Sequence, residues 1–176
     1  DMSRYTGSVG LDPSFLNGSL NVTVNAKGML TKNNFGDAGA IGSAVNMDPT
    51  KPVRDGDIGS NGYFQWMNYG ASLGTTNPVE QLMDVDNKST VKRFVGNAQF
   101  DYKLPFIQGL RANLNLATDY TTSDGHNNRP ITSPTNLTGG FNGKVNNYTG
   151  TNYNNLLDFY LNYVKDLSGI SSKVDL

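Results

Sequence analysis

Hydrophobic and polar residues alternate along several stretches of the chain. The longest alternating runs are Lys88 to Leu104 and Leu110 to Asp124, separated by the short link Pro105 to Gly109. Apolar or aromatic residues of the second run share the even positions, namely Leu110, Ala112, Leu114, Leu116 and Tyr120. Because successive side chains of a strand point to opposite faces, a period of two predicts strands with one apolar and one polar face. The proline and glycine of the link favour a hairpin between them.

Four further strands are predicted from the same alternation. They are Arg4 to Leu11, Ser19 to Thr31, Tyr153 to Leu167, and a short run from Ser172 to Leu176 at the chain end. Two stretches, 33–87 and 125–150, show no sustained alternation and are predicted to be long loops. Within the first, the small residues from Ala38 to Ala44 could form one helical turn or two.

Short and long connections alternate along this series of strands. The short ones are Asp12 to Gly18, Pro105 to Gly109 and Ser168 to Ser171, whereas 33–87 and 125–150 are long. Outer-membrane barrels have short periplasmic turns and long extracellular loops, and their strands exceed the ~5–6 residues usual in soluble sheets. We therefore expect an all-β fold of consecutive antiparallel strands from a large transmembrane β-barrel. Six strands are fewer than the ~8 of the smallest barrels, so residues 1–176 are expected to be part of a larger one.

Charge placement on the two faces agrees with a membrane barrel. The apolar positions include only Lys92 and Lys165, near strand ends, where a charge costs little in a bilayer. Aromatic residues would form two interfacial girdles, with Tyr102, Phe106 and Tyr163 near the short turns and Phe94, Tyr120 and Tyr153 near the long loops. The residues predicted to face lipid are Leu20, Val22, Val24, Phe100, Leu114, Leu116, Phe159 and Leu161.

Composition narrows the function without deciding the fold. The 176 residues carry a net charge of -1 with no basic cluster, which argues against a nucleic-acid partner. The sequence contains no cysteine and no long apolar run that would make a transmembrane helix. A mean hydropathy of -0.46 is compatible with a soluble sheet and equally with barrel strands, whose polar faces lower the average.

A family resemblance is carried by segments that together cover most of the chain. They are Arg4 to Val9, Leu11 to Leu16, Ala38 to Ala44, Met47 to Val53, Asn77 to Val79, Asp86 to Arg93, Leu110 to Leu116, and Leu156 to Tyr163. In this order they resemble the barrel of SusC/RagA-type TonB-dependent transporters. The resemblance implies uptake of an oligosaccharide or peptide across the outer membrane of a Bacteroidetes-type Gram-negative bacterium. It also implies a SusD-like surface lipoprotein as a lid, energy from the TonB complex, and a plug domain inside the barrel. We expect the plug, the TonB-contacting segment and the remaining strands to lie outside residues 1–176.

Candidate contact residues lie in the first long loop and on the polar face. Trp66, with Tyr63, Phe64 and Tyr69, could stack on a sugar ring, or could pack the loop onto itself or onto the lid. The residues expected to face the plug or the solute path are Arg93, Gln99, Asp101, Arg111, Asn113, Asn115 and Asp119. Most would simply form a hydrated wall, and Arg93 and Arg111 are the favoured plug contacts because a guanidinium makes bidentate bonds.

No catalytic or metal-binding constellation emerges. Asp84, Asp86 and Asn87 have the oxygen spacing of a Ca²⁺ loop but lack a later glutamate, and His126 has no partner ligand in the sequence. No nucleophile–base pair or phosphate loop is found, so we expect neither an enzyme nor a cofactor. The competing hypothesis is a soluble β-sandwich that binds carbohydrate, and a third is a barrel that serves only as an anchor.

Overall fold

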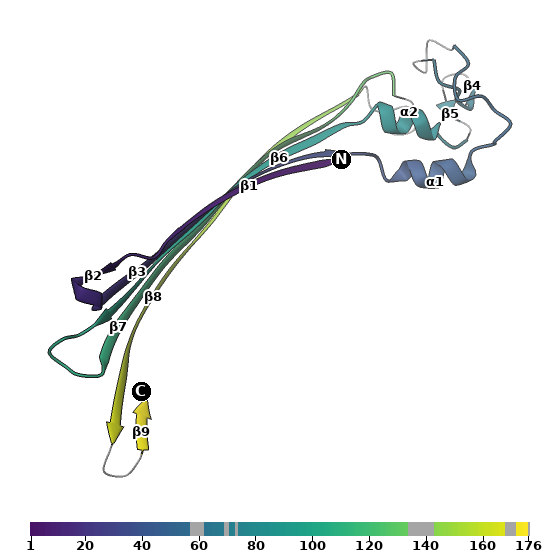
Figure 1. The fold of residues 1–176 in the computed structure, drawn as a ribbon. Coiled ribbons are helices and arrows are strands. Elements are labelled where there is room, and N and C mark those ends of the chain that lie inside the picture. Colours follow the sequence, from purple (N-terminus) through teal and green to yellow (C-terminus); the bar gives the residue numbers. More distant parts are fainter. Residues whose placement is uncertain (57–61, 69–70, 73, 134–142, 168–171, 176) are drawn as a thin grey trace. The chain divides into compact units, whose positions relative to one another are not determined.

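The computed structural model describes residues 1–56, 62–68, 71–72, 74–133, 143–167 and 172–175. Its main sheet follows the order β1-β3-β6-β7-β8-β9, so strands adjacent in this series along the chain are also neighbours in the sheet. These strands are β1 (Met2–Leu11), β3 (Leu20–Phe35), β6 (Asp86–Lys103), β7 (Leu110–Arg129), β8 (Lys144–Leu167) and β9 (Ser172–Asp175) (Figure 1). The short β2 (Ser14–Phe15) pairs with β3 and is followed by the 3-10 turn η1 (Leu16–Gly18). The sheet is a meander and does not close on itself, which confirms the predicted class of fold.

The chain forms two compact units. The strand unit comprises residues 4–31, 91–122 and 150–176, and the loop unit comprises residues 1–3, 32–90 and 123–149. The loop unit contains helices α1 (Gly39–Asn46) and α2 (Pro78–Met83), which pack against each other, and the small hairpin of β4 (Met67–Asn68) and β5 (Ala71–Ser72). Within the described residues, no helix is both long enough and apolar enough to cross a membrane.

The strands are longer than the alternation indicated. The predicted ends Thr31 and Asp124 become Phe35 and Arg129, and β8 begins at Lys144 instead of Tyr153. These extensions are rich in Asn, Thr and Lys, whose polarity suggested loops. Strand pairing depends on backbone N–H and C=O groups, so polar side chains do not end it. The predicted loops 33–87 and 125–150 therefore shrink to residues 36–85 and 130–143 between strands.

In the part of the chain that the structure describes, hydrophobic burial is confined to the loop unit. Among the described residues, the buried hydrophobic side chains are Ala40 and Tyr63, and both belong to that unit. In the strand unit, large apolar side chains such as Phe159 (62% exposed) and Leu116 (39% exposed) remain uncovered. The described part of the strand unit is therefore a sheet without a hydrophobic core of its own.

Candidate functional site

The polar face of the strand unit is organised by two Arg–Asp pairs. Arg93 on β6 donates through Nε to Asp119 Oδ1 at 2.8 Å and makes a second contact to the other carboxylate oxygen. Arg111 on β7 pairs with Asp101 on β6, with 3.1 Å between Nη2 and Oδ1. Each pair joins the two strands of the predicted hairpin on the face that alternation assigned to polar residues. Both pairs are partly exposed, and such pairs typically contribute ~0–1 kcal/mol to stability.

Amide side chains connect three strands on the same face. Asn25 of β3 donates to Asn97 Oδ1 at 3.1 Å, and Asn97 of β6 donates to Asn115 Oδ1 at 2.9 Å. Asn113 is buried on β7, whereas Gln99 is exposed. The structure thus pairs five of the seven predicted polar residues: Arg93 with Asp119, Arg111 with Asp101, and Asn115 with Asn97. Their contact with a plug or a solute stays a prediction.

The opposite face of the strand unit is apolar and uncovered. Even positions of three neighbouring strands meet there, since Val24, Gly96 and Leu116 line one shallow depression. None of the residues predicted to face lipid is buried. No second layer of described residues covers Phe100, Leu114 or Leu116. Contact of this face with lipid stays a prediction.

The aromatic group of the first loop is partly used for packing within the loop unit. Tyr63 is only 5% exposed, and its hydroxyl accepts from Arg54 Nη2 at 2.7 Å, with the guanidinium 4.2 Å from the ring centroid. Phe64 and Trp66 meet edge to face at 5.3 Å, and Lys51 Nζ lies 5.2 Å from the Trp66 ring centroid. These contacts match the alternative in which the aromatic residues pack the loop onto itself. Tyr69 lies outside the described residues, and contact of Trp66 with a solute or lid stays a prediction.

A buried polar network that the pattern of apolar and polar residues does not predict holds the loop unit together. Asn77 caps α2 by accepting from Val79 N (3.0 Å) and Glu80 N (3.4 Å), and its Nδ2 donates to the carbonyl oxygens of Val53 and Phe64. The backbone N–H of Asn77 donates to Gln65 Oε1 at 3.2 Å, and Gln65 Nε2 donates to Glu80. In a capping box the N3 glutamate bonds the N-cap backbone directly, whereas here Gln65 stands between the two.

Part of this network is readable from sequence. Asparagine followed by proline and, two residues later, glutamate is a helix-start signal, since Asn77 takes the N-cap, Pro78 the first turn and Glu80 position N3. Nothing in the sequence ties Gln65 to that helix, because residues 66 to 76 separate them and show no periodicity.

Two carboxyl groups of the loop unit, Glu80 and Asp37, have shifted pKa values for which burial is the largest single cause. Burial raises the pKa of Glu80 to about 7; nearby Asp84 and Asp55 add to this shift, whereas the bond from Gln65 opposes it. For Asp37, burial alone would raise the pKa, but the bond from the Gly39 N–H and the contacts with Gln81 and Arg129 hold it below its usual value. Glu80 therefore holds its proton up to near neutral pH, and Asp37 is ionised and paired with Arg129.

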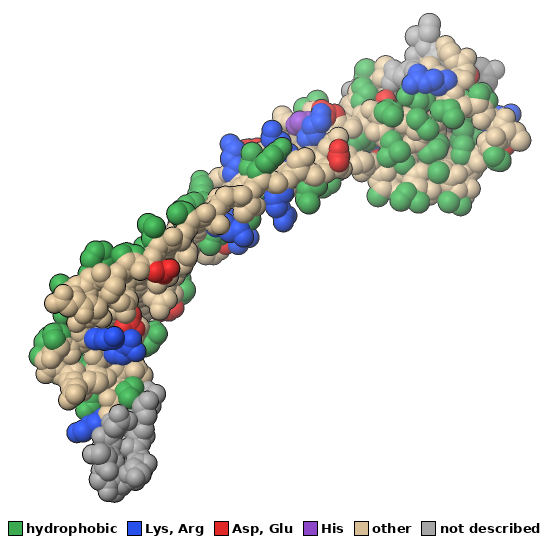
Figure 2. Space-filling model, in the orientation of Figure 1, with side chains coloured by type: hydrophobic (Ala, Val, Ile, Leu, Met, Phe, Trp, Pro, Cys, Tyr) green, Lys and Arg blue, Asp and Glu red, His purple; other side chains and the backbone are tan. Residues whose placement is uncertain are grey.

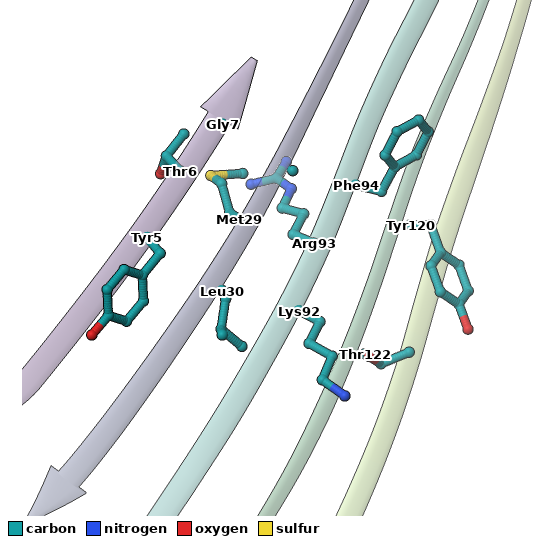
Figure 3. Close-up of a pocket in the computed structure, with 11 residues that line it drawn as sticks. Tyr5, Thr6, Gly7, Met29, Leu30, Lys92, Arg93, Phe94, Tyr120 and Thr122 are labelled. Atoms are coloured by element: carbon teal, nitrogen blue, oxygen red, sulfur yellow. The ribbon is translucent and has the colours of Figure 1, made fainter. Parts of the chain in front are cut away.

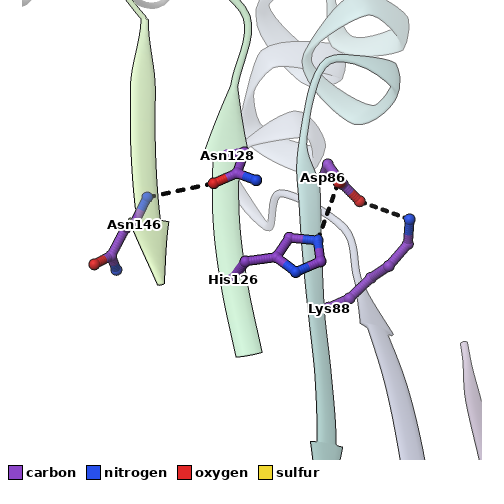
Figure 4. Close-up of polar contacts among 5 residues, drawn as sticks. All are labelled: Asp86, Lys88, His126, Asn128 and Asn146. Atoms are coloured by element: carbon purple, nitrogen blue, oxygen red, sulfur yellow. Dashed lines mark hydrogen bonds and ion pairs between the residues drawn. The ribbon is translucent and has the colours of Figure 1, made fainter. Parts of the chain in front are cut away.

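His126 and Asp86 meet at the loop-unit ends of β7 and β6. His126 Nε2 lies 3.0 Å from Asp86 Oδ2, and Lys88 Nζ lies 2.7 Å from Asp86 Oδ1 (Figure 4). Nearby, Asn128 Oδ1 accepts from the backbone N–H of Asn146 at 3.3 Å (Figure 4). Among residues with assigned positions, no three His, Asp or Glu side chains gather closely enough to hold a metal ion.

Hydrophobic side chains gather over the part of the loop unit that holds α1 and α2 (Figure 2). Helix α1 buries Ala40 but leaves Ile41 75% exposed and Val45 82% exposed. Residues four apart lie on the same side of a helix, so these two form one apolar patch. At the end of α2, Met83 is also exposed.

Comparison with known proteins identifies the family. No protein-family model matches the chain. Over 182 aligned positions the chain is 31% identical to the TonB-dependent receptor SusC of Bacteroides thetaiotaomicron, and the match covers 93% of this chain. The chain spans 18% of the length of that relative. SusC-like TonB-dependent receptors are transporters of the Gram-negative outer membrane and not enzymes. The chain therefore belongs to the SusC-like TonB-dependent receptors.

Proposed function

We propose that the full-length protein imports a nutrient across the outer membrane in a TonB-dependent manner. The observation that carries this proposal is the division of the strand unit into two faces. One face has exposed apolar side chains and no covering layer in the described residues, and the other has Arg–Asp pairs and bonded amides. A sheet with this division suits hydrocarbon on one side and a hydrated interior on the other.

The same observation disfavours a soluble β-sandwich. In a sandwich, the inner faces of two sheets pack together and bury their apolar side chains. The described part of the strand unit contains no buried hydrophobic side chain. A bilayer removes the apolar face from water without requiring a second sheet, and backbone groups within the sheet remain paired, as hydrocarbon requires.

We assign the loop unit to recognition outside the membrane. Its polar network fixes three segments around α2 and so presents a defined surface rather than a loose loop. The exposed apolar pair Ile41 and Val45 suits contact with a protein, and the proposed partner is a SusD-like surface lipoprotein. The proposed solutes are oligosaccharides or peptides, with Trp66 as the candidate aromatic contact.

The test begins with the location of the full-length receptor. We expect it in the outer-membrane fraction, soluble only with detergent, and migrating faster on a gel before heating than after heating, as folded barrels do. A detergent-free soluble monomer would overturn the proposal.

Uptake is then tested by growth. A strain lacking the gene is compared with a strain carrying the full-length gene, on a panel of oligosaccharides and peptides as sole nutrients. The control gene lacks only the TonB-contacting segment, so its barrel still assembles. We expect loss of growth on at least one solute, restored by the full-length gene and not by the control.

A further inference from the structure

A depression of about 610 Å³ lies on the apolar face of the strand unit. Four residues from four neighbouring strands, Tyr5, Leu30, Lys92 and Thr122, cross it in a row (Figure 3). Phe94 and Tyr120 line it on β6 and β7, and Gly7 and Gly28 line it on β1 and β3.

The two glycines give the depression its depth. A Cβ atom built on Gly7 or on Gly28 would meet no atom within 4 Å. Larger side chains would fit at both positions, so close packing within the chain does not require glycine there. Their effect is to leave backbone as the floor of a trough whose walls are the side chains of Leu30, Phe94 and Tyr120. A trough of this kind accepts an unbranched hydrocarbon chain.

Lys92 is a cation at one side of this trough. It forms no ion pair within the part of the chain that the structure describes, and its side chain is exposed. Its amine and the hydroxyl groups of Tyr5 and Tyr120 point in the same general direction (Figure 3). Amphipathic side chains in barrels orient their polar tips toward the membrane interface.

The length of β6 places Lys92 at a bilayer boundary. From Lys92 to the end of β6 at Lys103, eleven positions further on, no other apolar-face residue is charged. At ~3.3 Å per residue this is about 36 Å along the strand, which a tilt of ~45° reduces to about 25 Å. That height equals the apolar band of outer-membrane barrels, ~25 Å. The proposed function puts the hairpin at Pro105 to Gly109 on the periplasmic side, and in that orientation Lys92 would lie at the level of the outer headgroups.

We propose that this depression binds a phosphate-bearing, acylated lipid of the outer leaflet, with one acyl chain over Gly7 and Gly28 and the phosphate on Lys92. The inference rests on the proposed function, because it requires the apolar face to be in a bilayer. Charge complementarity selects the occupant, since an unpaired amine at headgroup level favours an anionic group. Aromatic side chains at the same level match the junction between headgroup and acyl chain.

The experiment uses the full-length receptor purified in mild detergent. Native mass spectrometry measures the lipid retained after exchange with phosphatidylglycerol, with phosphatidylcholine of the same acyl chains, or with inorganic phosphate alone. We expect the wild-type receptor to retain phosphatidylglycerol about fivefold more than phosphatidylcholine, and to retain no phosphate. Lys92→Gln should abolish that preference, whereas the control Lys103→Gln, on the polar face of the same strand, should preserve it. Retention of free phosphate without lipid would overturn the proposal.

Filling the trough tests the acyl-chain part. Gly28→Leu should reduce retention of both lipids several-fold. If that variant fails to assemble, a lipid with a photoactivatable acyl chain is cross-linked to the wild-type receptor and mapped by mass spectrometry. We expect cross-links at Leu30, Phe94 and Tyr120, and equal labelling of Phe159 and Leu161 would overturn the inference. If the receptor is inserted in the membrane and transports, but keeps its lipid preference after Lys92→Gln, the lipid-binding inference is wrong and the proposed transport function stands.

Discussion

Glu80 is the residue whose ionisation most affects the loop unit. It is fully buried, bonded by Gln65 and close to Asp84, and its pKa is raised from 4.5 to about 7. Between these two values the folded loop unit binds a proton that the unfolded chain releases. The stability of the loop unit is therefore greatest below pH 4.5, falls as pH rises toward 7, and levels off above that.

Substitution of Glu80 by glutamine tests this pH dependence. The amide of Glu80→Gln mimics the protonated carboxyl, so it should remove the trend and leave the loop unit more stable than wild type at pH 8. The stability of the loop unit is measured by hydrogen exchange of the backbone amides of residues 74–84 in the full-length receptor, corrected for the pH dependence of intrinsic exchange. For the wild type we expect protection to fall by up to about tenfold per pH unit between 4.5 and about 7.

Asp48→Asn is the matched control for Glu80→Gln. Hydrogen bonds from the Thr50 hydroxyl and N–H lower the pKa of Asp48, so it stays ionised across this range. Its removal should leave the wild-type trend intact. A trend that persists in Glu80→Gln would contradict the assignment to Glu80.

At the scale of elements, the hairpin between β6 and β7 depends on Gly109. Its φ of +91° favours glycine, and a Cβ there would lie 2.0 Å from the carbonyl oxygen of Val164. The Val164 N–H also donates to the Gly109 carbonyl at 2.9 Å, so the turn is fixed against β8. Any side chain at this position would push the two strands apart.

Comparison of Gly109→Ala with Gly18→Ala distinguishes the effect of backbone strain from that of the steric clash with the Val164 carbonyl oxygen. Gly18 has a φ of +85° but nothing within 4 Å of a Cβ, so alanine there costs only ~1 kcal/mol of strain. We expect Gly109→Ala to lower the yield of assembled full-length barrel several-fold and Gly18→Ala to leave it near wild type. The ratio of unheated to heated gel bands measures assembly. Equal yields would mean that β8 moves aside without loss.

The strands and the first long loop also show how much of the structure could be predicted from the sequence. The face on which each strand side chain lies was predictable. Side chains alternate between the two faces, so placing one residue of a run on a face places all the others. The pairing of Arg93 with Asp119 was not, since parity gives the face but not the position along the neighbouring strand. Strand ends such as Arg129 were missed because pairing continues through polar residues. The contact between Gln65 and Glu80 depends on a loop path that no local pattern encodes.

At the scale of the molecule, the two units are stabilised in different ways. The loop unit buries Ala40 and Tyr63 and is held by a hydrogen-bond network through Asn77. The stability of the strand unit, within the described residues, depends on backbone hydrogen bonds between strands and on the medium that covers its apolar face. Polar substitutions on exposed loop-unit surfaces should therefore leave assembly unchanged and alter only what binds there.

That separation allows a direct test of the proposed lid. Ile41 and Val45 are exposed on α1, so the double change Ile41→Asn with Val45→Asn should not destabilise the receptor. Burial of two such side chains in an interface contributes favourable binding free energy. Without it, we expect the affinity for the lid to fall at least tenfold. Co-purification of the surface lipoprotein with the tagged full-length receptor measures the effect. Ile131→Asn, which changes another exposed apolar residue of the same unit, should retain the lipoprotein. If both variants retain it equally, the lid contacts a different surface and α1 has another role.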